Sequence, residues 1–167
     1  FIGFVSLNAT LTGHILTRDG DTPKDGAAAP IFRIYGAAGL MTNGTGSGSF
    51  KDSGTVTGAT NATPIVITSA SHGLKTGTRI TVASVGGNTA ANGDFTITRV
   101  DDNSFSLDGS AGNGVYTSGG TWHVSGLYVF TMVCSAANGF EVGKTYTVYW
   151  TATVASVVRA DLMSFTV

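Results

Sequence analysis

Apolar and polar residues alternate with a period of two through much of this chain, most clearly within residues 62–122. This period places successive side chains on opposite faces of a β-strand, so that one face packs inward and the other meets water. Clusters of glycine, asparagine and aspartate, which favour tight turns, follow each alternating run. We therefore predict about four or five short strands that close into a small β-barrel. The alternating apolar pairs are Ile65 and Ile67, Ile80 and Val82, Phe95 and Ile97, and Phe105 and Leu107.

Strand-like runs also lie on both sides of this segment, and no stretch of the chain has helical spacing. The pattern predicts an all-β protein: an immunoglobulin-like β-sandwich with an inserted small β-barrel. The expected domains are a discontinuous sandwich, residues 1–57 plus 123–167, and an inserted barrel, residues 58–122. The pattern leaves the strand order of the sandwich open. The runs outside the barrel are residues 4–12, 14–17, 30–35, 49–56, 126–134, 144–154 and 157–167.

Three of the outer segments carry more detailed expectations. Residues 144–154 are the clearest amphipathic strand, with Trp150 on its apolar side and therefore in the core. Residues 126–134 are apolar on both faces apart from Thr131, which predicts a strand covered on both sides, either by its own domain plus the insert or by a neighbouring subunit. The glycine-rich residues 36–48 are interpreted as a hairpin or a flexible arm.

The inserted segment resembles a small β-barrel module that recurs as an insert in virion proteins of tailed bacteriophages. The likeness covers roughly residues 62–122 and implies a structural role in a virus particle, with no catalytic residues. The outer segments, especially residues 29–35, 126–128 and 137–148, also resemble sandwich domains of phage structural proteins. The motifs that carry the first resemblance are Pro64–Thr68, Ser71–Val82, Gly86–Ile97, Ser104–Ser110 and Tyr116–Trp122.

Composition narrows the choice of partners. Charged residues make up only 11% of the chain and the net charge is -1, so nothing draws the protein toward nucleic acid or an anionic membrane. No apolar run is long enough to span a bilayer. The single cysteine, Cys134, excludes an intramolecular disulfide framework, and its apolar surroundings predict a buried thiol.

Motifs for catalysis or cofactor binding are weak. Residues 139–145, Gly-Phe-Glu-Val-Gly-Lys-Thr, look like a phosphate-binding loop, but the spacing between the glycines is too short and a strand follows, not a helix. Asp19, Asp21 and Asp25 share one loop and could hold Ca²⁺, although a solvated turn is the favoured interpretation and the question stays open. His72 precedes Gly73 and is expected to cap a turn. We therefore expect no cofactor, no metal site and no enzyme.

Aromatic residues are the remaining candidates for a binding surface, because tyrosine and tryptophan stack on sugars and anchor protein interfaces. Tyr149 lies on the threonine side of its strand and Tyr116 lies in a glycine-rich loop, so these two residues are the expected surface contacts. The aromatic residues considered for exposure are Tyr116, Trp122, Tyr128, Tyr149 and Trp150.

These observations predict a non-enzymatic structural protein on the surface of a tailed-phage capsid or tail. A capsid decoration (cement) protein is the first expectation, and a tail, baseplate or fibre component is the alternative. A carbohydrate-binding adhesion module is a third possibility. The expected partners are the major capsid protein or tail proteins and copies of this chain, with a host-surface glycan for the third function.

Overall fold

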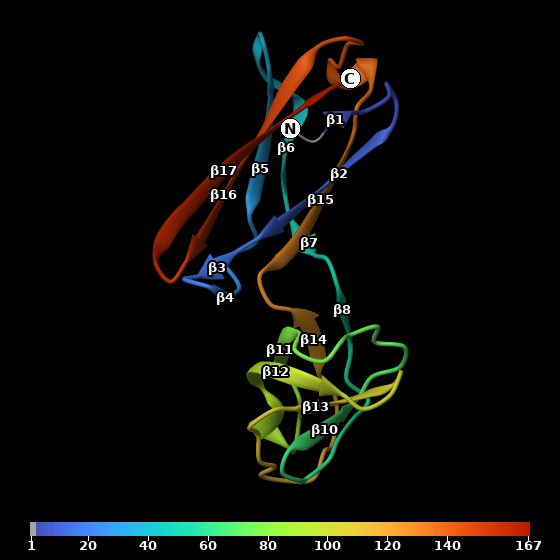
Figure 1. Ribbon diagram of the computed structural model, residues 1–167, viewed down its shortest axis with the longest axis vertical. Helices are drawn as coiled ribbons and strands as arrows, with labels where there is room; N and C mark the ends of the chain where they lie inside the picture. Colours follow the sequence, from blue (N-terminus) through green and yellow to red (C-terminus); the bar gives the residue numbers. More distant parts are fainter. Residues whose placement is uncertain (1–2) are drawn as a thin grey trace. The chain divides into compact units, whose positions relative to one another are not determined.

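The computed structural model describes residues 3–167 and confirms the all-β class (Figure 1). The only helices among the described residues are two short 3₁₀ turns, η1 (Thr89–Ala91) and η2 (Ala136–Asn138). The strands are β1 (Gly3–Phe4), β2 (Thr10–Leu16), β3 (Arg18–Asp19), β4 (Thr22–Pro23), β5 (Ile31–Gly36), β6 (Gly39–Ser47), β7 (Ser49–Phe50), β8 (Ser53–Thr55), β9 (Gly58–Ala59), β10 (Ile65–Thr68), β11 (Arg79–Ala83), β12 (Gly93–Arg99), β13 (Ser104–Leu107), β14 (Thr121–Val124), β15 (Leu127–Val133), β16 (Thr145–Val154) and β17 (Val157–Thr166).

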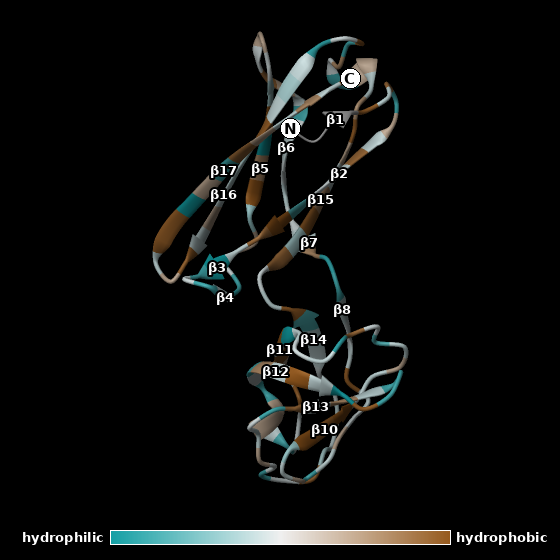
Figure 2. Ribbon diagram, viewed as in Figure 1, coloured by the Kyte–Doolittle hydropathy of each residue, from teal (hydrophilic) through white to brown (hydrophobic). Residues whose placement is uncertain are grey.

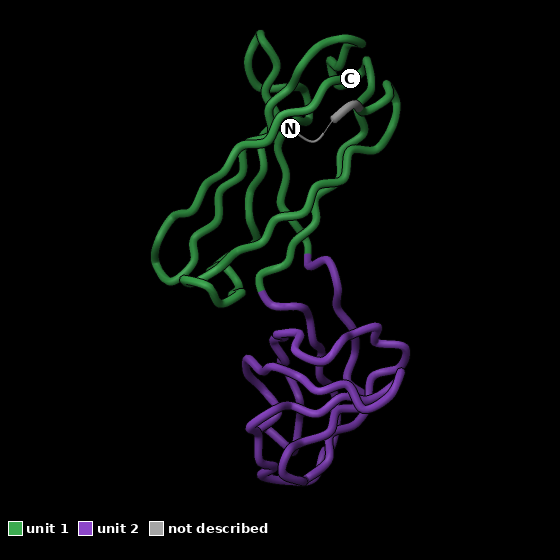
Figure 3. The backbone as a smooth tube through the Cα atoms, in the orientation of Figure 1, with its two compact units in different colours: residues 1–49, 126–167 green, residues 50–125 purple. Residues whose placement is uncertain are grey.

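The chain forms two compact units, which Figure 3 shows in different colours. The sandwich unit comprises residues 1–49 and 126–167, and the barrel unit comprises residues 50–125. β8 was expected in the sandwich, but it pairs with β14 of the barrel unit. That each unit folds as an independent domain with the expected boundaries stays a prediction.

The sandwich unit contains two main sheets that enclose one core. The larger has the order β1-β17-β16-β5-β6, and the smaller has the order β2-β15-β7. Phe32 of β5 stacks on Phe130 of β15, with ring centroids 4.7 Å apart, which ties the facing sheets together. The buried residues of this core are Leu11, Ile15, Phe32, Ile34, Tyr128, Phe130, Met132, Cys134, Phe140, Tyr146, Val148, Trp150, Ala152, Phe165 and Val167.

The strands β16 and β15 were expected to differ in the burial of their two faces. β16 alternates as expected, and Trp150 is buried in the core, which confirms its assignment. β15 was expected to be covered on both faces, by this chain or by a neighbouring subunit, and within this chain only one face is fully buried. It buries Tyr128, Phe130 and Met132 inside its own unit, whereas Val133 on the other face is 46% exposed. Tyr128, Phe130 and Met132 therefore belong to the core of the sandwich unit, and cover of the other face by a neighbouring subunit stays a prediction.

Residues 36–48, expected to be a hairpin or a flexible arm, form a hairpin: the chain turns after Gly36 and returns as the edge strand β6, antiparallel to β5. The glycines that suggested an arm have a packing role. Gly46 lies opposite Phe32 across the β5–β6 ladder, and a Cβ at Gly46 would lie 2.6 Å from two ring carbons. Gly13 faces Phe130 in the same way across the β2–β15 ladder. Each glycine leaves room for the aromatic ring of its cross-strand neighbour.

The barrel unit is built on one curled sheet with the order β8-β14-β11-β12-β13-β10-β9. Its two edge strands, β8 and β9, are separated by only Val56 and Thr57 in the chain. The N–H of Val56 donates to Gly120 beside one edge, and the N–H of Thr57 donates to Thr68 at the other edge, so this short segment spans both edges of the curled sheet. The buried core residues are Val56, Ala59, Ile65, Ile67, Leu74, Ile80, Val82, Val85, Ala91, Ile97, Phe105, Leu107 and Trp122.

Candidate interaction surface

The outer face of the five-stranded sheet is the face of the sandwich unit turned away from its core. β16 buries Tyr146, Val148 and Trp150, so the alternate residues of the same strand point outward. Hydroxyl pairs mark this outer face: Thr147 lies 3.4 Å from Ser164, and Thr145 lies 3.1 Å from Thr166.

Tyr149 occupies the middle of this outer face and is half-buried. Its neighbours across the ladders are Arg33 of β5 and Leu162 of β17. Tyr35 points to the same face two residues beyond Arg33 and is 37% exposed. Diagonal positions on one sheet face are about 7–8 Å apart, which is within reach of two tyrosine side chains.

Large apolar side chains lie on the same face as Tyr149 and are exposed to solvent. Ile31 is 41% exposed, Leu162 60% and Val158 68%. In Figure 2 the strands of this sheet carry hydrophobic positions along their length. Exposed apolar side chains that gather on one flat sheet face indicate an interaction site. We call the following set the outer sheet surface: Ile31, Arg33, Tyr35, Tyr149, Val158 and Leu162.

A shallow groove adjoins the outer sheet surface where β5 begins. Its volume is about 420 Å³, and Ala27–Ala29, Ile31, Thr151–Thr153 and Val158 line it. The N–H of Ala27 donates to the carbonyl of Thr153 at 2.8 Å, which holds the alanine segment beside β16. The groove presents methyl and methylene groups and extends the apolar character of the surface.

Tyr116, the second expected contact, is engaged within the barrel unit. Its hydroxyl donates to the carbonyl oxygens of Val56 and Gly119 at 3.2 and 3.1 Å, and its ring packs against the barrel core. These bonds attach a glycine-rich loop to the barrel. A binding role for Tyr116 stays a prediction.

Two other aromatic residues considered for exposure are buried, so that expectation was wrong. Trp122 is 2% exposed, and its indole N–H donates to Ser69 Oγ at 2.7 Å. Tyr128 is also 2% exposed, and its hydroxyl accepts the N–H of Gly26 at 3.2 Å. Burial raises the pKa of the Tyr128 hydroxyl.

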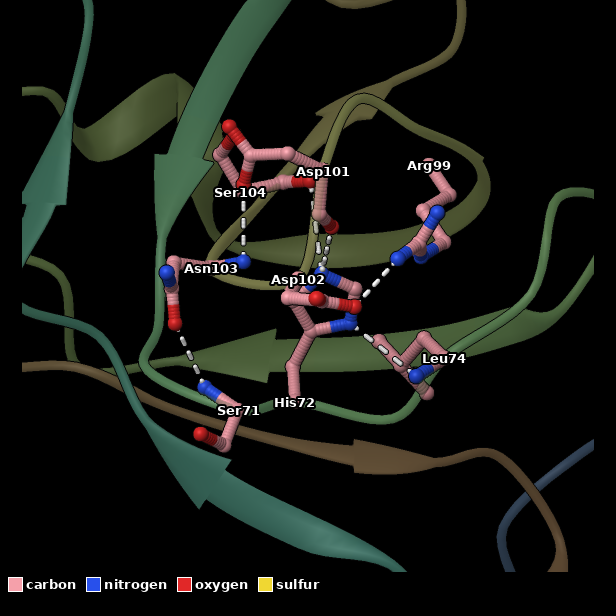
Figure 4. Close-up of polar contacts among 8 residues, drawn as sticks. All are labelled: Ser71, His72, Leu74, Arg99, Asp101, Asp102, Asn103 and Ser104. Atoms are coloured by element: carbon pink, nitrogen blue, oxygen red, sulfur yellow. Dashed lines mark hydrogen bonds and ion pairs between the residues drawn. The ribbon is translucent and has the colours of Figure 1, made fainter.

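A polar network around His72 connects two turns of the barrel unit (Figure 4). The imidazole Nδ1 accepts the N–H of Leu74 at 3.0 Å, which confirms that His72 caps a turn. With Nδ1 an acceptor, Nε2 carries the proton and lies 2.9 Å from the carbonyl oxygen of Asp101. The N–H of Asn103 donates to the Asp101 carboxylate at 2.7 Å, and this bond lowers the pKa of that carboxyl. The network stabilises turns and uses both ring nitrogens.

Asp19 and Asp25, two aspartates of the expected turn, contact different partners. Asp19 lies 3.4 Å from Lys24, and Asp25 accepts the N–H of Gly126 at 2.7 Å. Across residues 3–167, no group of three or more His, Cys, Asp or Glu side chains is arranged to hold a metal ion.

The remaining motifs have structural roles. Residues 139–145 lead from η2 into β16, with Gly139 and Gly143 at positive φ, as expected for a turn. Cys134 is buried as expected, and burial raises the pKa of its thiol. The described part of the chain has no helix that is long and apolar enough to cross a membrane.

Comparison with known proteins yields distant likenesses among solved structures. No protein family model matches the chain, and no curated protein matches it. Among solved structures, the chain is similar to phage phi92 endosialidase, with 15% sequence identity and a TM-score of 0.30. The likeness covers 99% of this chain and 27% of the endosialidase chain, so this chain spans little more than a quarter of that protein.

This comparison corrects one expectation. The chain was expected not to be an enzyme, yet the protein that it resembles is an enzyme by name. The exclusion of enzymes is therefore withdrawn. A TM-score of 0.30 transfers no activity, so neither an enzyme nor a non-enzyme is established.

Proposed function

We propose that this chain is a structural component of a tailed-bacteriophage particle, attached through its outer sheet surface. The observation that carries the proposal is the exposure of Ile31, Val158 and Leu162 on the same sheet face as Tyr149. A face of this composition is suited to burial against a protein partner, with the aromatic ring as its anchor. The resemblance of residues 62–122 to a phage virion module directs the proposal toward a phage particle.

The more specific proposal is a capsid decoration protein, with the major capsid protein as its partner. A capsid lattice presents many equivalent sites, so modest contacts can be combined into firm attachment when neighbouring copies also touch. The alternative within the particle is a tail, baseplate or fibre component. The two locations differ in copy number, because a capsid shell has hundreds of equivalent positions and a tail has far fewer.

A second candidate is a carbohydrate-binding module, and the positions of Tyr149 and Tyr35 favour it. Two tyrosines on one sheet face can stack on sugar rings, while Arg33, opposite Tyr149 and two residues before Tyr35, can donate hydrogen bonds to hydroxyl groups. A host-surface glycan would be the ligand in this case.

Attachment to the particle can be tested with one substitution in the outer sheet surface. Ile31→Asp places a charge among apolar side chains and should weaken rebinding to particles stripped of the protein by about tenfold or more. Val115→Asp is the matched control, because Val115 is an apolar residue of the barrel unit that is 75% exposed. Equal rebinding of the two variants would contradict attachment through this face.

A further inference from the structure

β17 has an open edge along residues 157–163. β16 pairs with the whole of β17, whereas β1 covers the other side only at Phe165 and Thr166. Within the described residues, no strand pairs with that other side of residues 157–163. Residues 157–162 are all exposed. An edge of this kind presents unpaired N–H and C=O groups to a further strand.

The ladder identifies which backbone groups point out of the sheet. The carbonyl of Thr166 accepts the N–H of Val5 at 2.8 Å, on the side away from β16. Because the direction alternates along a strand, Val158, Ala160 and Leu162 also direct their N–H and C=O groups outward. The N–H of Leu162 accordingly donates to the Asp161 carboxylate at 2.7 Å and takes no part in the ladder with β16.

Two charged side chains lie on the core-facing side of this edge strand. Arg159 is opposite Ala152 and Asp161 is opposite Trp150, yet both charged residues are exposed. Charges at such positions normally prevent edge-to-edge pairing. Here the two charges are opposite in sign and flank Ala160, so a suitably placed second copy of the strand would neutralise them.

We propose that two copies of this chain associate through their β17 edges, antiparallel to each other, with a two-fold axis at Ala160. Arg159 of each copy then lies opposite Asp161 of the other. The apolar positions match as well: Val158 meets Leu162 of the second copy, and Val157 meets Met163. The paired edges are self-complementary, as a two-fold interface requires.

The charges of Arg159 and Asp161 favour a two-fold axis at Ala160 over an axis at either adjacent residue. A two-fold axis at Arg159 or at Asp161 would place two like charges directly opposite each other, which destabilises a strand pair. With the axis at Ala160, the Arg159–Asp161 pairs occupy the non-hydrogen-bonded positions, where side chains lie closest together. Outward N–H and C=O groups of Val158, Ala160 and Leu162 then complete the ladder. In the dimer the Leu162 N–H exchanges the Asp161 carboxylate for a carbonyl of the second strand, and the carboxylate turns to Arg159 of the second copy.

The opposite edge of the same sheet is less suited to pairing. β6 has a register shift against β5 between Arg33 and Tyr35, and Asn43 has a positive φ of 54°. Irregular backbone of this kind twists an edge away from an incoming strand. The regular part of β17 is therefore the favoured edge for a second copy, and this inference does not depend on the proposed function.

Analytical ultracentrifugation tests the proposal. A strand pair of this size buries little surface, so we expect a monomer–dimer equilibrium with a dissociation constant on the order of tens of micromolar. Arg159→Asp alone and Asp161→Arg alone each create like-charge pairs and should weaken the dimer about tenfold or more. Lys75→Asp and Glu141→Arg make the same charge changes at exposed positions elsewhere and should leave the dimer unchanged.

Mixing the two single variants gives the decisive result. In a mixed pair, the aspartate introduced at position 159 of one chain faces the arginine introduced at position 161 of the other. The unchanged Asp161 of the first chain faces the unchanged Arg159 of the second, so both pairs join opposite charges. An equimolar mixture of two weakly associating variants should therefore form a heterodimer with about the affinity of the unmodified chain. The double exchange, Arg159→Asp with Asp161→Arg in one chain, should restore the homodimer in the same way.

Folding is checked by circular dichroism and thermal unfolding of each variant, since both side chains are exposed and the fold should persist. An unmodified chain that stays monomeric up to about 1 mM would overturn the proposal. Single variants that associate as strongly as the unmodified chain, or a mixture that fails to recover association, would also overturn it.

Discussion

Tyr149 lies directly opposite Arg33 across the β16–β5 ladder, at the centre of the exposed face of the larger sheet. The alternation that buries Trp150 also turns Tyr149 outward. A half-buried aromatic residue whose cross-strand neighbours are an arginine and an exposed leucine, Leu162, combines apolar area with hydrogen-bonding capacity. This arrangement makes Tyr149 the residue of the outer sheet surface best placed to contact a partner.

The carbohydrate candidate predicts a specific loss at Tyr149. Tyr149→Ala removes the stacking ring and should reduce glycan binding about tenfold, measured on a glycan array and then by titration with the strongest ligand. Tyr149→Phe keeps the ring and should retain most of the binding. A flat array for the unmodified chain would eliminate this candidate and leave the particle proposal standing.

Glycines packed against aromatic rings should be intolerant of even a methyl group. A Cβ at Gly46 would lie 2.6 Å from the Phe32 ring, and a Cβ at Gly54 would lie 2.7 Å from the Trp122 ring. Gly46→Ala and Gly54→Ala should each destabilise the protein by about 1–3 kcal/mol, because the rings must shift within packed cores.

Calorimetry can show in which of the two units each glycine substitution lowers the stability. If the two units fold as independent domains, Gly46→Ala should lower the unfolding temperature of the sandwich transition and Gly54→Ala that of the barrel transition. Thr45→Ala and Thr55→Ala change exposed neighbours on the same strands and should have small effects. A single transition that responds equally to both glycine variants would contradict independent folding.

The hydrogen bonds of His72 should contribute to the stability of the barrel unit independently of the packing of its ring. His72→Phe keeps a ring against Phe105 but leaves the Leu74 N–H and the Asp101 carbonyl without their imidazole partners. The free energy of unfolding of the barrel unit should fall by about 1–3 kcal/mol in urea denaturation. His123→Phe serves for comparison, because His123 is less buried and stacks on Phe50. Equal stability of the His72 variant and the unmodified chain would argue against the capping role.

Tyr128 predicts a loss of stability at alkaline pH. Burial raises the pKa of its hydroxyl in the folded state, whereas an unfolded tyrosine ionises at a pKa of about 10. The unfolded state therefore releases this proton first. Stability should be intact below pH about 10 and should fall as the pH rises through the folded-state pKa. Tyr128→Phe should flatten this part of the pH profile in thermal melts, and an unchanged slope would contradict the assignment.

Local alternation predicted the barrel strands β10–β14, the amphipathic strand β16 and the burial of Trp150, because side chains alternate between the two faces of a strand. It did not predict that β8 and β9 complete the barrel sheet, since these short strands carry no clear alternation. It did not predict that Trp122 is buried. Gly54, a residue distant in the chain, provides the space for that ring, and Ser69 provides the acceptor for its N–H. These partners are brought together by the strand order, which a local pattern does not contain.

Only part of the candidate surface could be predicted, because the neighbours of Tyr149 also depend on the strand order. Tyr149 could be placed on the polar side of its strand, but its neighbours Arg33 and Leu162 follow from the pairing of β16 with β5 and β17. The open edge of β17 likewise depends on which strand lies beside it. Glycines in β6 suggested a flexible arm because their function, making room for Phe32, involves another strand.

Quantitative mass spectrometry of purified phage particles tests the central proposal most directly. The account predicts peptides of this chain in the particles, at hundreds of copies per particle for a capsid decoration protein and at a few to tens for a tail component. Particles that lack these peptides, although infected cells contain the protein, would contradict a structural role in the virion.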